Sequence, residues 1–175
     1  MGISAETIKE LREMTSCGVI ECKKALEAAK GNFDQAKEIL RKRGLEIAAK
    51  KAGRAAREGR VEVYIHPGSK LGVLVEVNSE TDFAARSEDF LVFSKNVAMH
   101  IAACQPAYIR REDIPASILK TQPDQETFVK EKCLLAQPFV KDPAKTIQDC
   151  LNELVAKAGE NINITRFVRY KVGEN

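Results

Sequence analysis

The pattern of apolar and polar positions changes its period near the middle of the chain. Between residues 71 and 78 apolar side chains alternate with mostly polar or small ones, which predicts a strand with one apolar face. From residue 90 the apolar positions recur every three or four residues, which predicts an amphipathic helix. A polar turn over residues 79–83 joins the two elements. Loops between rigid elements often carry binding groups, so this turn is a candidate site.

The first 44 residues predict three short helices. Three such helices hold little apolar area and lie near the lower limit for independent stability, so we expect the bundle to dock on another molecule. The residues that can cap, break or stop these helices are Ser4, the break at residues 15–18, Gly31, Asn32 or Asp34, and Gly44.

Beyond the bundle, residues 45–59 are rich in Ala, Lys and Arg and predict an exposed helical linker that stops at Gly59. A strand is predicted over residues 60–66, where Val61, Val63 and Ile65 alternate with other residues, and residues 67–70 supply the hairpin turn to the strand at 71–78.

The C-terminal third predicts a weak helix at residues 124–135, a turn at 137–139 and a helix that begins at Asp142-Pro143 and stops at Gly159. A last strand follows, with alternating Ile162, Ile164, Val168, Tyr170 and Val172.

Three strands in hairpin order with helices among them predict an α+β fold, in which a three-stranded antiparallel sheet is packed with helices. We therefore expect three parts: a helical domain at residues 1–50, a basic helical linker at 51–59 and an α+β core at 60–175.

The composition, 44% apolar and 30% charged, is that of a chain able to bury a core. No run of about 18 apolar residues predicts a membrane span. The N-terminal sequence has no apolar signal core, so we expect a cytoplasmic protein.

Basic residues are concentrated in one segment. Residues 41–60 hold eight Lys/Arg against two Glu, a local charge of +6, and the remainder of the chain carries −3. A solvated helix face explains this pattern most simply. The alternative function is an RNA-binding module that uses this segment, although no aromatic residues lie among the bases to stack on nucleotides.

The sequence contains no phosphate-binding glycine loop, no metalloprotease motif and no nucleophile elbow, and it has only two histidines. We therefore expect no enzyme, no cofactor and no metal site. His100 and Cys104 lie four residues apart and could bind a metal, but a packed histidine and cysteine are favoured. A redox or metal protein that uses the cysteines, Cys17 and Cys22 above all, is the third alternative.

The turn itself permits two interpretations. Thr81 or Asp82 could cap the following helix while Phe83 packs beneath it as a hydrophobic staple. Alternatively, Asp82 and Phe83 project outward into a partner. The pattern alone favours the first interpretation.

Four stretches carry a family resemblance, in chain order LREMTSCGVIECKKALEAAKGNFDQA, RGLEIAAKKAGR, GVLVEVNSETDFAAR and GENINITRFVRY. Together they resemble translation elongation factor Ts over nearly the whole chain, and QPFVKDP and NVAMHIAACQP resemble the central domain of that family. The resemblance implies a guanine-nucleotide exchange factor for the GTPase elongation factor Tu. It also implies a ubiquitin-associated-like helical domain at the N-terminus.

The resemblance further implies the sites. Thr81, Asp82, Phe83 and Ala84 would act on the Mg²⁺ site of the GTPase, with Phe83 as a wedge between two helices of the partner and Asp82 against the groups that support the ion. A docking surface would include Arg12, Thr15, Gly18 and Val19. The expected partner is elongation factor Tu, without direct contact to nucleic acid or membrane.

Two features depart from the family pattern. Val19 stands where the family commonly has Met, and residues 114–133 are short beside the usual helical hairpin of the family. The chain resembles the short form with a single core unit, for which a homodimer is a hypothesis.

Overall fold

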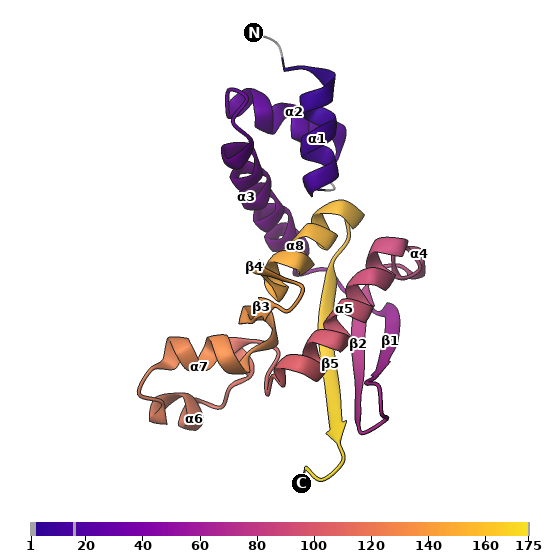
Figure 1. Ribbon diagram of the computed structural model, residues 1–175, viewed down its shortest axis with the longest axis vertical. Helices are drawn as coiled ribbons and strands as arrows, with labels where there is room; N and C mark the ends of the chain where they lie inside the picture. The colour runs from indigo at the N-terminus through magenta and orange to yellow at the C-terminus, as the bar shows by residue number, and fades with distance from the viewer. Residues whose placement is uncertain (1–2, 16, 175) are drawn as a thin grey trace.

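The computed structural model describes residues 3–15 and 17–174. Ser16, inside the predicted break at 15–18, lies outside the described residues. The N-terminal bundle consists of α1 (Ala5–Thr15), α2 (Val19–Ala28) and α3 (Phe33–Lys51) (Figure 1). Leu11 and Leu26 lie in its buried core. The predicted caps are confirmed: the Ser4 hydroxyl accepts from the Thr7 amide at 3.1 Å, and the Asn32 side chain accepts from the Gln35 amide at 2.9 Å.

Helix α3 is longer than predicted, because it continues through Gly44 to Lys51. Gly44 was predicted to end it, but a glycine inside a helix costs only about 1 kcal/mol relative to alanine. The C-terminal half of α3 packs on α8 (Ile147–Ala158), and that packing outweighs the local preference. The predicted helical linker at 51–59 is also wrong, because the helix stops at Lys51 and Gly59 lies within a strand. The division into domains stays a prediction.

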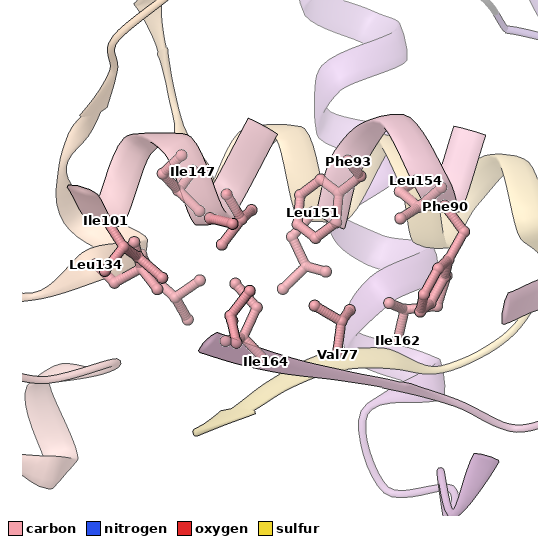
Figure 2. Close-up of a cluster of buried hydrophobic side chains, with 14 of the residues drawn as sticks. Val77, Phe90, Phe93, Ile101, Leu134, Ile147, Leu151, Leu154, Ile162 and Ile164 are labelled. Atoms are coloured by element: carbon pink, nitrogen blue, oxygen red, sulfur yellow. The ribbon is translucent and has the colours of Figure 1, made fainter. Parts of the chain in front are cut away.

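The sheet has three antiparallel strands in the order β1-β2-β5, as the sequence predicts. These are β1 (Glu58–Ile65), β2 (Leu71–Ser79) and β5 (Ile162–Lys171). Helices α5 (Glu88–Cys104) and α8 cover one face, and the side chains of the two layers point toward one another (Figure 2). The row Val73, Val75 and Val77 on β2 is buried there, which confirms the predicted apolar face.

The other face of the sheet is open, and it is also apolar. Val61, Val63 and Ile65 on β1 lie on this exposed face rather than in the core. The alternation predicted for β5 fails at one point. The pairing of β5 with β2 shifts register between the β2 residues Glu76 and Val77, which places a bulge in β5. Before the bulge Ile164 is buried, and after it Tyr170 is exposed, although an even spacing predicts one common face.

The segment between α5 and α8 holds small elements: η1 (Arg111–Asp113), α6 (Ala116–Thr121), α7 (Gln125–Lys132), η2 (Leu134–Ala136), β3 (Pro138–Phe139) and β4 (Asp142–Thr146). The predicted turn at 137–139 and the predicted helix start at Asp142-Pro143 are wrong, because β3 and β4 pair there as a short hairpin. Helix α8 begins instead after Thr146. The Thr146 hydroxyl accepts from the Asp149 amide, and the Asp149 carboxylate accepts from the Thr146 amide. The two residues therefore form a reciprocal cap.

Helix α7 confirms the predicted helix at 124–135 but ends at Lys132. None of the helices that the structure describes is both long and apolar enough to span a bilayer.

Two of the glycines that were predicted as helix stops, Gly44 and Gly59, give opposite expectations for substitution. A Cβ on Gly44 would lie 4.0 Å from the Asn152 carbonyl oxygen, which is ordinary contact. Gly44→Ala should therefore raise the unfolding free energy by about 1 kcal/mol. Gly59 has φ +143°, and its Cβ would lie 2.2 Å from the Val77 carbonyl oxygen. Gly59→Ala should lower the unfolding free energy by roughly 3 kcal/mol. Urea denaturation measures both changes, and equal effects would contradict this account.

Candidate functional site

The turn after β2 forms a tip, defined here as residues 80–84. Thr81 is the N-cap of the four-residue helix α4 (Asp82–Ala85), and its hydroxyl accepts from the Ala84 amide at 3.3 Å. The predicted cap is thus confirmed, with Thr81 in that role. The predicted staple is wrong, because the Phe83 side chain is 83% exposed.

Helical geometry explains why Phe83 points outward. Ala84 and Ala85 are both buried, so they define the side of α4 that faces the protein interior. A helix of a single turn can bury only one of its sides. The side chains at the preceding positions therefore face solvent. An exposed phenyl group on a rigid turn has no folding role, and large aromatic side chains are enriched among the residues that dominate protein interfaces.

Asp82 lies beside Phe83 on the same exposed side. Its carboxylate accepts from the Arg86 guanidinium at 2.5 Å, one helical turn away. Both side chains are more than half exposed, and exposed ion pairs of this kind contribute little to stability. The Asp82 carboxylate can therefore exchange Arg86 for another cation or donor at small cost.

A contact distant in sequence anchors the tip. The Glu160 carboxylate accepts from the Thr81 amide at 3.0 Å and from the Thr81 hydroxyl at 2.7 Å. Sequence reasoning missed Glu160, because 79 residues separate it from Thr81. The stretch GENINITRFVRY contains it, but no local pattern links it to the turn.

The four predicted docking residues lie where α1 ends and α2 begins. Arg12 is exposed, and the Thr15 hydroxyl donates to the Leu11 carbonyl at 2.7 Å. Gly18 is the N-cap of α2, and Val19 is 51% exposed. The same junction exposes two further apolar side chains that sequence reasoning missed, Met14 and Ile20. Their exposure on an otherwise packed bundle was the missing signal, and only the tertiary structure contains it.

The basic segment at 41–60 is largely neutralised within the protein. Five of its eight cations lie within 4.0 Å of a carboxylate, and three of these pairs join separate elements: Arg41 with Asp149 at 3.7 Å, Arg43 with Glu21 at 2.8 Å and Arg54 with Glu80 at 3.5 Å. Lys51 donates to the Gly159 carbonyl. Within residues 3–15 and 17–174, Lys50 and Arg57 have no acidic partner. Few cations remain for a polyanion such as RNA.

The cysteines do not form a reactive site. All five are free thiols, and burial raises the pKa values of Cys17, Cys104, Cys133 and Cys150, the last to about 11. A thiol with a raised pKa is a poor nucleophile and a poor metal ligand. Among the residues that the structure describes, no cluster of three or more His, Cys, Asp or Glu side chains could hold a metal ion.

His100 is a buried structural residue, as the sequence favours. Its Nδ1 accepts from the Val140 amide at 3.3 Å, so Nε2 carries the proton and donates to the Gln137 side-chain oxygen at 2.9 Å. The Cys104 thiol lies 3.7 Å from Nδ1. Burial lowers the pKa of His100 from its ordinary value of 6.5, because a charged ring would lose its hydration. The imidazole joins α5 to the β3-β4 hairpin.

An α+β core with a projecting aromatic tip, attached to a helical bundle with its own exposed apolar residues, is the architecture of a protein-binding factor. Comparison with known proteins identifies which one. The family model described as Elongation factor TS matches residues 5–125 and 124–174.

The relatives agree with the family model. Elongation factor Ts of Acetivibrio thermocellus is 53% identical over 195 aligned positions, covering 98% of this chain and 91% of that protein. Elongation factor Ts of Alkaliphilus oremlandii is 50% identical, covering 99% of this chain and 91% of its own length. That of Carboxydothermus hydrogenoformans is 48% identical, covering 98% and 90%. The chain belongs to the elongation factor Ts family and is a translation elongation factor.

The aligned positions outnumber the 175 residues of this chain, so these relatives carry residues that it lacks. This is consistent with a shortened segment such as residues 114–133.

The buried His100 predicts how stability depends on pH. Its pKa is lower in the folded chain than in the unfolded chain, so only the unfolded chain gains a proton as the pH first falls below about 6.5. The unfolding free energy should therefore decrease from neutral pH toward pH 5.5, by no more than about 1.4 kcal/mol per pH unit. Urea denaturation at several pH values measures the change. His100→Gln should lose this dependence and His66→Gln, which alters an exposed ring, should keep it; the reverse would contradict the assignment.

Proposed function

We propose that the chain is a guanine-nucleotide exchange factor for elongation factor Tu. It binds the GDP-bound GTPase, disturbs its Mg²⁺ site and promotes release of GDP. The observation that carries this proposal is the exposed Phe83 beside Asp82 on an anchored tip. Membership of the elongation factor Ts family supports the choice of partner.

In this proposal the N-terminal bundle, a ubiquitin-associated-like module, docks first. Arg12, Thr15, Gly18 and Val19 form the docking surface, and the apolar side chains of Met14 and Ile20 enlarge it. The smaller Val19, where the family commonly has Met, offers less contact area, and the two exposed neighbours offset that loss. The docked bundle holds the tip close to the nucleotide site.

The tip then acts mechanically. Phe83 inserts between two helices of the GTPase and moves them apart, while Asp82 leaves Arg86 and engages groups that support the metal ion. Mg²⁺ requires a near-ideal octahedral shell and links the nucleotide phosphates to the protein. A small displacement of its supporting groups therefore weakens both the metal and the nucleotide.

Thermodynamic linkage makes this an exchange activity without any covalent step. A factor that binds the nucleotide-free GTPase more tightly than the GDP-bound form must weaken GDP binding by the same ratio. The factor itself then needs no general acid, no nucleophile and no cofactor. In this sense it is not an enzyme.

We further propose that two copies associate through the open face of the sheet. Cross-strand neighbours Val63 and Leu74 form an apolar pair on that face, and Ile65 and Tyr170 extend it. Contiguous exposed apolar side chains of this kind mark interaction sites. A two-fold dimer brings the same patch of both copies together, so the patch must be complementary to itself. An apolar patch meets this requirement because no opposite charges have to be matched. The tip lies at the end of β2 and stays free in such a dimer.

The exchange proposal predicts the effect of truncating the tip. Phe83→Ala and Asp82→Ala should each slow factor-stimulated GDP release by roughly 10- to 100-fold, because truncating one of the few residues that dominate an interface costs about 2 kcal/mol or more. Release of a fluorescent GDP analogue from elongation factor Tu, with catalytic amounts of the chain, measures the rate.

Val92→Ala is the matched control for these variants, because Val92 is an exposed apolar residue on α5, outside the tip. It should leave the rate unchanged. All three variants should keep their unfolding free energy within about 0.5 kcal/mol of the parent. Normal GDP release with stable Phe83→Ala and Asp82→Ala proteins would overturn the proposed function. In the RNA-binding alternative, steeply salt-dependent RNA binding would persist in both variants.

The dimer proposal predicts that charge on the open sheet face separates the copies. Leu74→Arg should weaken self-association by about 100-fold, since it places like charges together in a buried interface. Val92→Arg, an equal change on the helical side, should have no effect. Sedimentation velocity over a range of concentrations measures both. A parent chain that stays monomeric at micromolar concentration would contradict this proposal.

A further inference from the structure

We infer that Glu80, Glu160 and Asn161 are positioning residues that hold residues 81–84 of the tip in their active geometry and set their place relative to the N-terminal bundle. The three form what we call the clasp. The inference rests on the proposed function for its effect on exchange, but the ordering of the tip by the clasp can be measured in the free chain.

The clasp is reciprocal. The Glu160 carboxylate accepts from the Thr81 backbone amide and hydroxyl. The Glu80 carboxylate accepts from the Asn161 backbone amide at 2.6 Å. Glu80 and Thr81 in one loop therefore bond with Asn161 and Glu160 in the other. The loop that leaves β2 and the loop that enters β5 are fastened together at two points, so neither can rotate alone.

A third segment joins the same cluster. The buried Asn161 side-chain amide donates to the Arg54 carbonyl at 2.6 Å, and the Arg54 guanidinium lies 3.5 Å from the Glu80 carboxylate. Lys51, the last residue of α3, donates to the Gly159 carbonyl. The chain that leaves the N-terminal bundle is thus attached to the two loops that form the clasp.

The tip needs these contacts because it cannot order itself. Helix α4 has four residues, and a helix of one turn is unstable in isolation because nucleation is unfavourable. Ala84 and Ala85 anchor its inner side, and the clasp anchors its N-cap. The hydrogen bond from the Asn161 backbone amide, and after it the charge of Arg54, lower the pKa of Glu80, because both favour the charged carboxylate.

The expected effect of a weakened clasp is on apparent affinity. If the tip occupies its active geometry in only a fraction of the molecules, the concentration of factor needed for half-maximal exchange rises by the inverse of that fraction. The maximal rate changes less, because bound molecules still hold Phe83 and Asp82. Loss of Phe83 itself removes an interaction of the proposed complex and lowers the maximal rate as well.

The experiment compares Glu160→Ala with Glu160→Gln and Glu126→Ala in the full-length chain. Glu126 pairs with Arg111 on the surface away from the clasp, so its variant controls for loss of an exposed ion pair. In Glu160→Ala, hydrogen exchange of the Thr81 amide, followed by NMR, should accelerate by roughly 10-fold or more, because its acceptor is lost. The concentration for half-maximal GDP release should rise by about 5- to 10-fold.

Glu160→Gln keeps one carbonyl acceptor and should fall between the parent and Glu160→Ala in both measurements. Glu126→Ala should match the parent. An unchanged Thr81 amide in Glu160→Ala overturns the inference, and so does a faster amide with unchanged half-maximal concentration. Failure of the proposed function gives a different result, which is normal GDP release with Phe83→Ala. In that case hydrogen exchange of the Thr81 amide still decides whether the clasp orders the tip.

Discussion

Strand β2 pairs along both of its edges, and most of the remaining structure depends on that double pairing. Hydrogen bonds to β1 and β5 fix its register, and the two-residue period then assigns Val73, Val75 and Val77 to the core. Because the register is fixed, the chain leaves the sheet at the buried Ser79 in one direction only. A slip of one residue would expose the valines and redirect the tip. The rigidity of the tip therefore begins in the sheet.

Irregular positions in this regular frame create the surfaces available for binding. The bulge in β5 turns Tyr170 to the open face of the sheet, where a regular strand would have buried it with Ile164. The one-turn helix α4 similarly leaves Phe83 in solvent while it buries Ala84. Each departure exposes an apolar side chain without opening the core. Binding surface and stable fold are thus compatible in a small protein.

Some charged residues connect the parts of the molecule. Cations of the basic segment pair with acids outside the bundle, Arg41 with Asp149 on α8 and Arg54 with Glu80 at the tip. Exposed pairs contribute little stability individually, so their main consequence is geometric. They help to fix the bundle, the core and the tip in one arrangement.

The sequence alone determined the elements whose causes are local. The strand at 71–78, the helix from residue 90 and the cap Ser4 follow from neighbours a few residues apart, and the other two caps were narrowed to Asn32 or Asp34 and to Thr81 or Asp82. The family resemblance supplied the candidate tip residues, but the pattern favoured a packed Phe83. Only the tertiary structure decided that α3 passes Gly44, which side of the sheet is open, and that Glu160 holds Thr81. Those outcomes depend on contacts between residues far apart in the chain, which no local period encodes.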